Sequence, residues 1–115
     1  MSKTLNVENF TVLYIDDNDG NVRLLTRRLG TLGAKCVVST KPRKTIELIN
    51  EHKPHVILLD LYMPGLSGFE VLEEIRKHEA FKDIPVWAFS ANSDAESRIK
   101  CNKAGFDGFL AKPIM

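Results

Sequence analysis

The sequence lacks the features that mark several large classes of protein. It has no excess of one charge, because 16 Lys and Arg stand against 15 Asp and Glu, so no overall basic field is available to hold nucleic acid or an anionic membrane. No apolar run approaches the roughly 20 residues of a membrane span, and the segment before Phe10 has no apolar stretch long enough for a signal peptide. We therefore expect no direct contact with nucleic acid and no membrane insertion.

Cysteine is also scarce. Cys36 and Cys101 lie far apart, with no Cys-x-x-Cys pair and no neighbouring cysteine or histidine at metal-ligand spacing. This pattern predicts two buried, small apolar residues in a reducing compartment. We expect a cytoplasmic protein.

The length and composition indicate one globular unit. The 115 residues are the usual size of one domain, and 43% apolar with 27% charged residues is ordinary for a globular protein. A mostly disordered chain would have fewer apolar residues. We expect a single domain over residues 1–115, which is too short for a receptor together with an effector.

Short apolar runs alternate along the chain with segments of helical spacing. This alternation is typical of a parallel sheet covered by helices on both faces. The third and fourth runs are almost unbroken in apolar character, so we expect them to be central strands. The five expected strands cover residues 12–15, 36–38, 56–59, 84–89 and 109–111.

Apolar residues at helical spacing predict helices between these runs. A fourth helix, near residues 94–104, offers little besides Ile99 and Ala104 to bury, so we expect it to pack loosely. The other three helical faces are marked by Val22, Leu25, Leu29 and Leu32, by Ile46 and Ile49, and by Phe69, Leu72 and Ile75.

Polar residues follow four of the five runs. Asp16 and Asp17 follow the first run, Asp60 the third, Ser90 the fourth and Lys112 the fifth. Ligand sites in open parallel sheets lie at the carboxyl ends of the strands, so these side chains should converge. Three neighbouring carboxylates repel one another unless a cation is present, and a hard divalent ion such as Mg²⁺ suits them. Such a site favours phosphoryl transfer, in which an Asp can itself be the nucleophile.

Four motifs carry these residues. Each is common on its own, but each lies at the end of a different predicted strand. Together, in this order and at this spacing along the whole chain, they resemble the response regulator receiver family. The motifs are Ile-Asp-Asp-Asn at 15–18, Leu-Leu-Asp-Leu-Tyr-Met-Pro-Gly at 58–65, Phe-Ser-Ala at 89–91 and Phe-Leu-Ala-Lys-Pro at 109–113.

The resemblance implies an α/β, flavodoxin-like fold with a five-stranded parallel sheet in the order 2-1-3-4-5 and helices on both faces. It also implies a phosphoacceptor signalling domain of a two-component phosphorelay, and not a turnover enzyme. The phosphoryl group would come from the phosphohistidine of a histidine kinase or a phosphotransfer protein. Phosphorylation would then shift the face made by the fourth helix and the fifth strand, which a downstream protein partner would read.

The resemblance further assigns the acceptor and the metal ligands. Asp60 would be the phosphoacceptor. Asp17, Asp60 and the backbone carbonyl of Tyr62 would contact Mg²⁺ directly, and Asp16 would act mainly through a bound water.

Three more residues receive roles by the same resemblance. Lys112 would pair with the acceptor carboxylate before the reaction and with the phosphoryl oxygens after it. Ser90 would turn its hydroxyl onto one of those oxygens, and Phe109 would swing inward to fill the space that Ser90 leaves. The bond between Lys112 and Pro113 would be cis.

The chain departs from the family pattern at its end. Receivers normally continue past the Lys-Pro pair into a fifth helix, whereas this sequence stops at Met115. We therefore expect an uncovered apolar face of the sheet. Either the chain is a piece of a longer protein, or it completes its core as a homodimer.

Other functions compete with this interpretation. A magnesium-dependent phosphohydrolase of the haloacid dehalogenase type also forms an aspartyl phosphate, but it has a second Asp two residues after the nucleophile, where this chain has Tyr62. A degenerate receiver would bind partners without phosphorylation, although every chemical position is filled here. A nucleotide-binding module would need a glycine-rich phosphate loop after the first strand, which is absent from the sequence.

Overall fold

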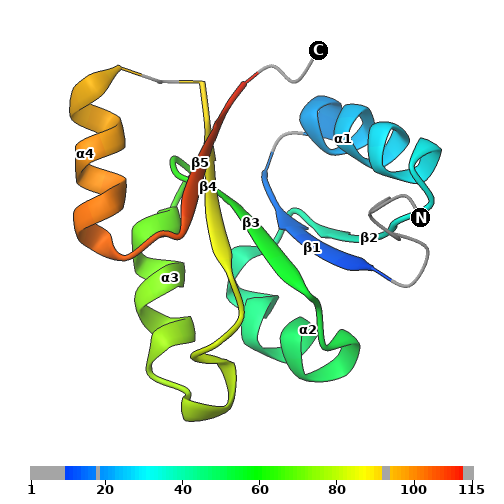
Figure 1. Ribbon diagram of the computed structural model, residues 1–115, viewed down its shortest axis with the longest axis horizontal. Coiled ribbons are helices and arrows are strands. Elements are labelled where there is room, and N and C mark those ends of the chain that lie inside the picture. Colours follow the sequence, from blue (N-terminus) through cyan, green and yellow to red (C-terminus); the bar gives the residue numbers. More distant parts are fainter. Residues whose placement is uncertain (1–9, 18, 92–93, 113–115) are drawn as a thin grey trace, which may run out of the picture.

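The centre of the molecule is a parallel sheet of five strands (Figure 1). The computed structural model describes residues 10–17, 19–91 and 94–112. The order of the strands is β2-β1-β3-β4-β5, which confirms the predicted order, and β3 and β4 are internal as expected. The fourth strand begins two residues later than predicted. The strands are β1 (Thr11–Ile15), β2 (Lys35–Ser39), β3 (Val56–Asp60), β4 (Val86–Ser90) and β5 (Gly108–Ala111).

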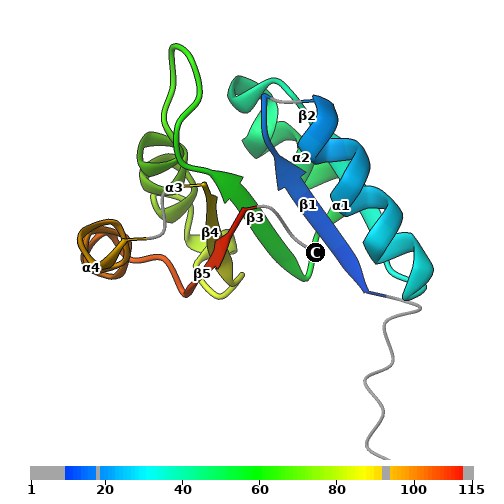
Figure 2. The same cartoon turned by 90° about the horizontal axis from the view of Figure 1, so that it is seen from above.

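Four α-helices connect the strands in the described part of the chain. They are α1 (Asp19–Thr31), α2 (Thr45–His52), α3 (Gly68–Arg76) and α4 (Ala95–Ala104), with short 3-10 helices η1 (Pro42–Lys44) and η2 (Glu79–Phe81). Helix α1 lies on one side of the sheet, and α2 and α3 lie on the other (Figure 2). None of the described helices has both the length and the apolar character needed to cross a membrane.

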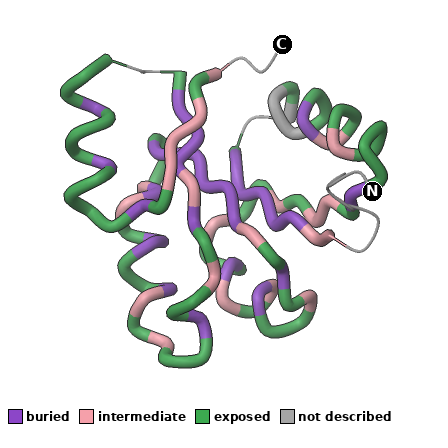
Figure 3. The backbone as a smooth tube through the Cα atoms, viewed as in Figure 1, coloured by how far each residue is buried: buried purple, intermediate pink, exposed green. Residues whose placement is uncertain are grey.

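Alternation along the strands divides the core in two, because successive side chains of a strand point to opposite faces. On β1, Leu13 and Ile15 belong to the larger cluster, on the side of α2 and α3. Val12 and Tyr14 belong to the smaller cluster, on the side of α1. Figure 3 shows the resulting run of buried residues through the middle strands.

Helix α3 begins directly against the end of β3. The Ser67 hydroxyl accepts the backbone N–H of Glu70, and the Glu70 carboxylate accepts the N–H of Ser67, which forms a capping box. At the next position, a β-carbon on Gly68 would collide with the carbonyl oxygen of Asp60 and lie 3.0 Å from the Cα of Leu61. Only glycine therefore allows the helix to approach the last residue of β3 so closely.

Two predicted helical faces need correction. In α1, Leu25 is buried, but Leu32 is 64% exposed because the helix ends at Thr31; the side chain of Val22 lies outside the described residues. The burial expected for Ile99 and Ala104 of α4 was wrong, since Ile99 is 55% exposed and Ala104 is exposed; the loose packing expected of this helix stays a prediction. The helix instead buries Ser97 and Cys101, which share a face at a spacing of four residues. Ile99 lies midway between them in sequence and hence on the other side of the helix.

A side-chain network joins the amino ends of β4 and β5. The guanidinium of Arg76, at the end of α3, donates to the carbonyl oxygens of Phe81, Lys82 and Ile84 and forms a 3.0 Å ion pair with Asp107. The same Asp107 oxygen accepts the backbone N–H of Val86 at 2.8 Å. These contacts link α3 to the segments that lead into both strands.

Among the described residues, an apolar groove lies on the side of the sheet that faces α1. Its volume is about 310 Å³. Trp87 lies half-buried in its wall. Other apolar side chains that line it are Val12, Leu29, Leu32, Leu58 and Leu110.

Candidate functional site

The carboxyl ends of β1, β3 and β5 bring two carboxylates and one ammonium group into contact. Lys112 follows β5, and its Nζ lies 2.9 Å from Asp16 Oδ2 and 3.1 Å from Asp60 Oδ1. Asp16 is fully buried, and Asp60 is 5% exposed. The three side chains converge as the sequence predicted, because the parallel sheet places the carboxyl ends of all its strands at one edge.

A third carboxylate completes an acidic cluster. Carboxylate oxygens of Asp16, Asp17 and Asp60 all lie within 4.8 Å of one another. Asp17 is exposed, so the cluster opens to solvent on that side. Tyr62 lies two residues after the end of β3, and it is 53% exposed.

The electrostatics of the cluster favour an added cation. Burial and the charge of Asp16 raise the pKa of the Asp60 carboxyl from 3.8 to about 6, although the hydrogen bond and the charge of Lys112 act in the opposite direction. Three carboxylates and one ammonium would leave two negative charges if all were ionised. Oxygen donors with this charge fit a hard divalent ion such as Mg²⁺.

The sequence analysis missed one polar contact of the cluster. Tyr14, on β1, is fully buried, and its phenol oxygen donates a hydrogen bond to Asp16 Oδ2. Burial, followed by this hydrogen bond, raises the pKa of the phenol above its ordinary value. The signal in the sequence is a tyrosine two residues before a strand-end aspartate, since the two side chains then share a face.

Ser90 and Phe109 lie toward the face of the sheet that carries Ala88, because Ser90 is two residues after Ala88 on β4 and Phe109 is the register partner of Ala88. Ser90 is 1% exposed at the end of β4, and Phe109 lies beside Ala88 on the neighbouring strand. The Phe109 ring is half-buried, and the guanidinium carbon of Arg98, on α4, lies 4.8 Å from its centroid. A pocket of about 150 Å³ opens beside this ring. The predicted switch residues are thus close in space, although their movement stays a prediction.

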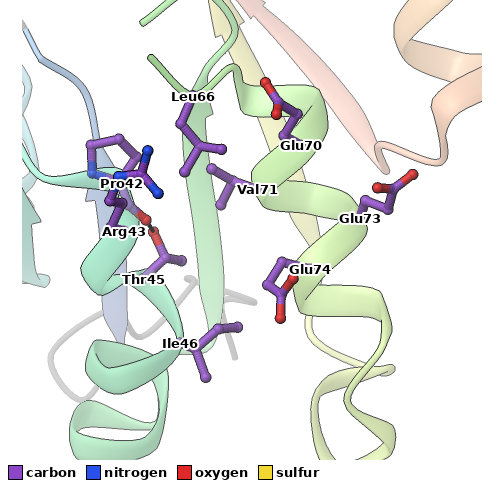
Figure 4. Close-up of a pocket in the computed structure, with 9 residues that line it drawn as sticks. All are labelled: Pro42, Arg43, Thr45, Ile46, Leu66, Glu70, Val71, Glu73 and Glu74. Carbon is purple, nitrogen blue, oxygen red and sulfur yellow. Dashed lines mark hydrogen bonds between the residues drawn. The ribbon is translucent and has the colours of Figure 1, made fainter. Parts of the chain in front are cut away.

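A cleft of the described structure lies away from the carboxylates. It has a volume of about 380 Å³ and lies between α2 and α3 (Figure 4). Its walls include Ile46, Leu66 and Val71, with Arg43 on one side and Glu74 on the other. None of the predicted site residues lines it. We assign the chemistry to the strand ends, because buried carboxylates and an ammonium group converge there. Pro113, whose peptide bond was expected to be cis, lies outside the described residues.

Comparison with known proteins agrees with this geometry. A family model described as the response regulator receiver domain matches residues 12–115. The peroxide stress-activated histidine kinase mak1 of Schizosaccharomyces pombe is 37% identical over 111 residues, which cover 91% of this chain and 7% of that protein. An uncharacterized 76.5 kDa protein of Thiocystis violacea is 30% identical over 105 residues, which cover 91% of this chain and 15% of that protein. The chain therefore spans only a small part of these relatives.

A solved structure has the same fold. The receiver domain of the sensor histidine kinase PA1611 of Pseudomonas aeruginosa superposes with a TM-score of 0.83 at 27% identity, covering 93% of this chain and 88% of that one. Its description includes a magnesium ion coordinated in the active site cleft of that protein. Because the match over residues 12–115 spans all five strands and the strand order agrees, the chain belongs to the response regulator receiver domain family, the phosphoacceptor domains of two-component signalling.

Proposed function

We propose that Asp60 accepts a phosphoryl group from the phosphohistidine of a histidine kinase or phosphotransfer protein. An Asp60 carboxylate oxygen attacks phosphorus, so that a P–O bond forms while the P–N bond breaks. The bonding electron pair stays on the imidazole nitrogen, which takes up a proton. The observation that carries the proposal is the position of Lys112 Nζ, which lies within 3.1 Å of the carboxylates of both Asp16 and Asp60.

Lys112 supplies positive charge to the phosphoryl oxygens in this proposal. It exchanges its 3.1 Å contact with Asp60 Oδ1 for the oxygens of the bound group. A bound Mg²⁺ would offset negative charge on the same oxygens. Asp17, Asp60 and the backbone carbonyl of Tyr62 would hold the ion, with Asp16 acting through a water. The carboxylate cluster described above fits this ion because all its donors are oxygens.

Ser90 and Phe109 transmit the change in this proposal. The Ser90 hydroxyl bonds a phosphoryl oxygen, and the Phe109 ring moves into the space that Ser90 leaves. The Phe109 ring is half-buried and lies beside a pocket, which gives it space to move. In its present position the ring contacts the guanidinium of Arg98. The face of α4 and β5 then changes shape, and a downstream protein partner reads it. The domain assists its own phosphorylation and dephosphorylation and does not act as a turnover enzyme.

The decisive experiment is the intact mass of the purified chain after incubation with Mg²⁺ and a small acyl phosphate. We expect the gain of one phosphoryl group by the wild type and by Asp83→Asn, an exposed aspartate in a turn. The gain should be absent in Asp60→Asn and after addition of a chelator. Release of phosphate on every turnover without a covalent species would favour a hydrolase instead. A persistent failure to gain mass in a chain that binds Mg²⁺ would favour a receiver that works without phosphorylation.

We also propose that residues 1–115 form a single domain. The apolar groove beside α1 would be the surface through which two copies of this domain form a homodimer. Leu32 supports this, because a leucine that is 64% exposed on the rim of an apolar groove favours a covered state. The predicted cytoplasmic location stays a prediction.

Sedimentation at micromolar concentration tests the homodimer. The wild type should form dimers, Leu32→Glu should be monomeric, and Leu24→Glu should remain dimeric, since Leu24 is also partly exposed on α1 but does not line the groove. A monomeric wild type would exclude self-association through this face.

A further inference from the structure

The Tyr14 phenol is buried beside the acidic cluster and donates a hydrogen bond to Asp16. The residue has no exposed surface. Its ring packs at 5.5 Å from the ring of Phe89, tilted by 59°. A buried phenol needs a hydrogen-bond partner, because an unsatisfied hydroxyl costs about 1–3 kcal/mol. At this position the partner is a carboxylate of the proposed metal site.

The geometry of β1 makes this contact possible. Tyr14 and Asp16 are two residues apart, so their side chains leave the same face of the strand, with Cα atoms roughly 6.6 Å apart. A tyrosine is long enough to cover that distance, and Phe89 holds the ring in place from the neighbouring part of the sheet. A phenylalanine at position 14 could make the same ring contact but would leave Asp16 without this donor.

Tyr14 and Lys112 both contact the same oxygen of Asp16. Asp16 Oδ2 accepts from the Tyr14 hydroxyl and lies 2.9 Å from Lys112 Nζ. Two donors from different strands fix the rotation of the carboxylate, since each restrains it from a different direction. These two contacts at Oδ2 set the direction in which the Asp16 carboxylate can face a cation or its bound water.

We propose that Tyr14 is a positioning residue for the metal site, which orients the Asp16 carboxylate so that the site is selective for Mg²⁺. This inference rests on the proposed function, because it presumes that Asp16 serves a cation. Lys112 cannot replace the phenol in this role. Its ammonium also pairs with Asp60 and, in the proposed mechanism, moves to the phosphoryl oxygens, whereas the phenol is on the same strand as Asp16 and stays in place.

Selectivity for Mg²⁺ over Ca²⁺ distinguishes a positioning role of Tyr14 from a hydrogen bond that only stabilises the fold. Mg²⁺ demands near-ideal octahedral geometry, whereas Ca²⁺ accepts irregular geometry and a variable number of oxygens. A carboxylate free to rotate therefore harms Mg²⁺ binding more than Ca²⁺ binding. A hydrogen bond that only stabilised the fold would, when lost, affect both ions by the same factor.

Calorimetric titration of the unphosphorylated chain with Mg²⁺ and, separately, with Ca²⁺ tests the proposal. The variant is Tyr14→Phe, which keeps the ring and removes only the hydroxyl. Loss of a hydrogen bond to a metal-site carboxylate typically lowers metal affinity by about 10- to 100-fold, and we expect about tenfold for Mg²⁺ and a clearly smaller factor for Ca²⁺. The control is Thr45→Val, which loses the buried 2.7 Å hydrogen bond from Thr45 to the Pro42 carbonyl on the other side of the sheet.

Thermal unfolding of the metal-free proteins accompanies the titrations. If Tyr14→Phe keeps the wild-type affinity for Mg²⁺, Tyr14 has no positioning role. The same conclusion follows if Tyr14→Phe loses affinity for Mg²⁺ and Ca²⁺ by the same factor, which is the result expected of a variant such as Thr45→Val that only destabilises the fold. If the wild type itself binds neither ion, the proposed metal site fails and the inference fails with it. Binding of Mg²⁺ by the wild type together with a selective loss in Tyr14→Phe supports both.

Discussion

Replacement of Asp60 by asparagine should make the metal-free chain more stable near neutral pH. Asp60 is 5% exposed, and burial together with the charge of Asp16 raises the pKa of its carboxyl from 3.8 to about 6. At pH 7.5 the folded chain therefore carries a charge that its surroundings disfavour. Asparagine has nearly the same shape without the charge, and its side-chain oxygen can still accept a hydrogen bond from Lys112.

The size of the effect follows from the shift in pKa. A rise of about two units corresponds to about 3 kcal/mol at 1.36 kcal/mol per unit, and this is an upper limit for Asp60→Asn at pH 7.5. The pKa of the Asp60 carboxyl is higher in the folded chain than in the unfolded chain. The stabilising effect of a protonated Asp60 is therefore complete below pH 3.8, and it is lost as the pH rises through about 6. The advantage of the variant should therefore be about 2 kcal/mol at pH 7.5 and shrink toward zero near pH 4.

Urea unfolding followed by far-ultraviolet circular dichroism measures this difference. The proteins are compared in a chelator at pH 7.5, 6 and 4.5, with Asp83→Asn as the exposed control. The reasoning is wrong if Asp60→Asn is less stable than the wild type at pH 7.5, or if the gap does not narrow as the pH falls. Added Mg²⁺ should reverse the order, because at 100 times the dissociation constant it stabilises the wild type by about 2.7 kcal/mol.

Three further substitutions probe the contacts around the strands. Lys112→Met should lower the free energy of unfolding of the metal-free chain at pH 7.5 by about 3 kcal/mol, since two buried carboxylates lose their cation; a change below 1 kcal/mol in urea unfolding would contradict this. Gly68→Ala should cost about 2 kcal/mol by overpacking and weaken Mg²⁺ binding in calorimetry, whereas Gly30→Ala, with open space around it, should be neutral or stabilising. Arg76→Met should cost about 2 kcal/mol in thermal unfolding, and more than Asp107→Asn, because it loses three carbonyl contacts as well as the ion pair.

The sequence was sufficient for the sheet and for the charged residues of the site. Unbroken apolar runs followed by Asp60 or Lys112 predict parallel strands with their polar ends at one edge, and the 2.9 Å and 3.1 Å contacts of Lys112 confirm that convergence. This works because strand order and direction alone bring the ends together, without any detail of side-chain packing.

Contacts that depend on side-chain packing could not be predicted in the same way. The sequence places Tyr14 in an apolar strand and does not show that its hydroxyl donates to Asp16. That contact can be inferred only when Asp16 is known to be buried on the same face. In α4 the most apolar residue, Ile99, is exposed, because the helix packs through the small side chains of Ser97 and Cys101. Hydrophobicity alone does not identify the buried face of a helix that has so few apolar residues.

The Arg76–Asp107 network has a mechanical consequence for the other end of the sheet. It ties the amino ends of β4 and β5 together, so we expect any movement of this strand pair to be a rotation about that end and not a translation. Strand β5 has four residues and is about 13 Å long, so a rotation of about 5° moves its carboxyl end by about 1 Å. A displacement of that size is enough to break a hydrogen bond at Lys112. Whether Lys112 contacts Asp60 is therefore coupled to the angle of the strand that α4 packs against.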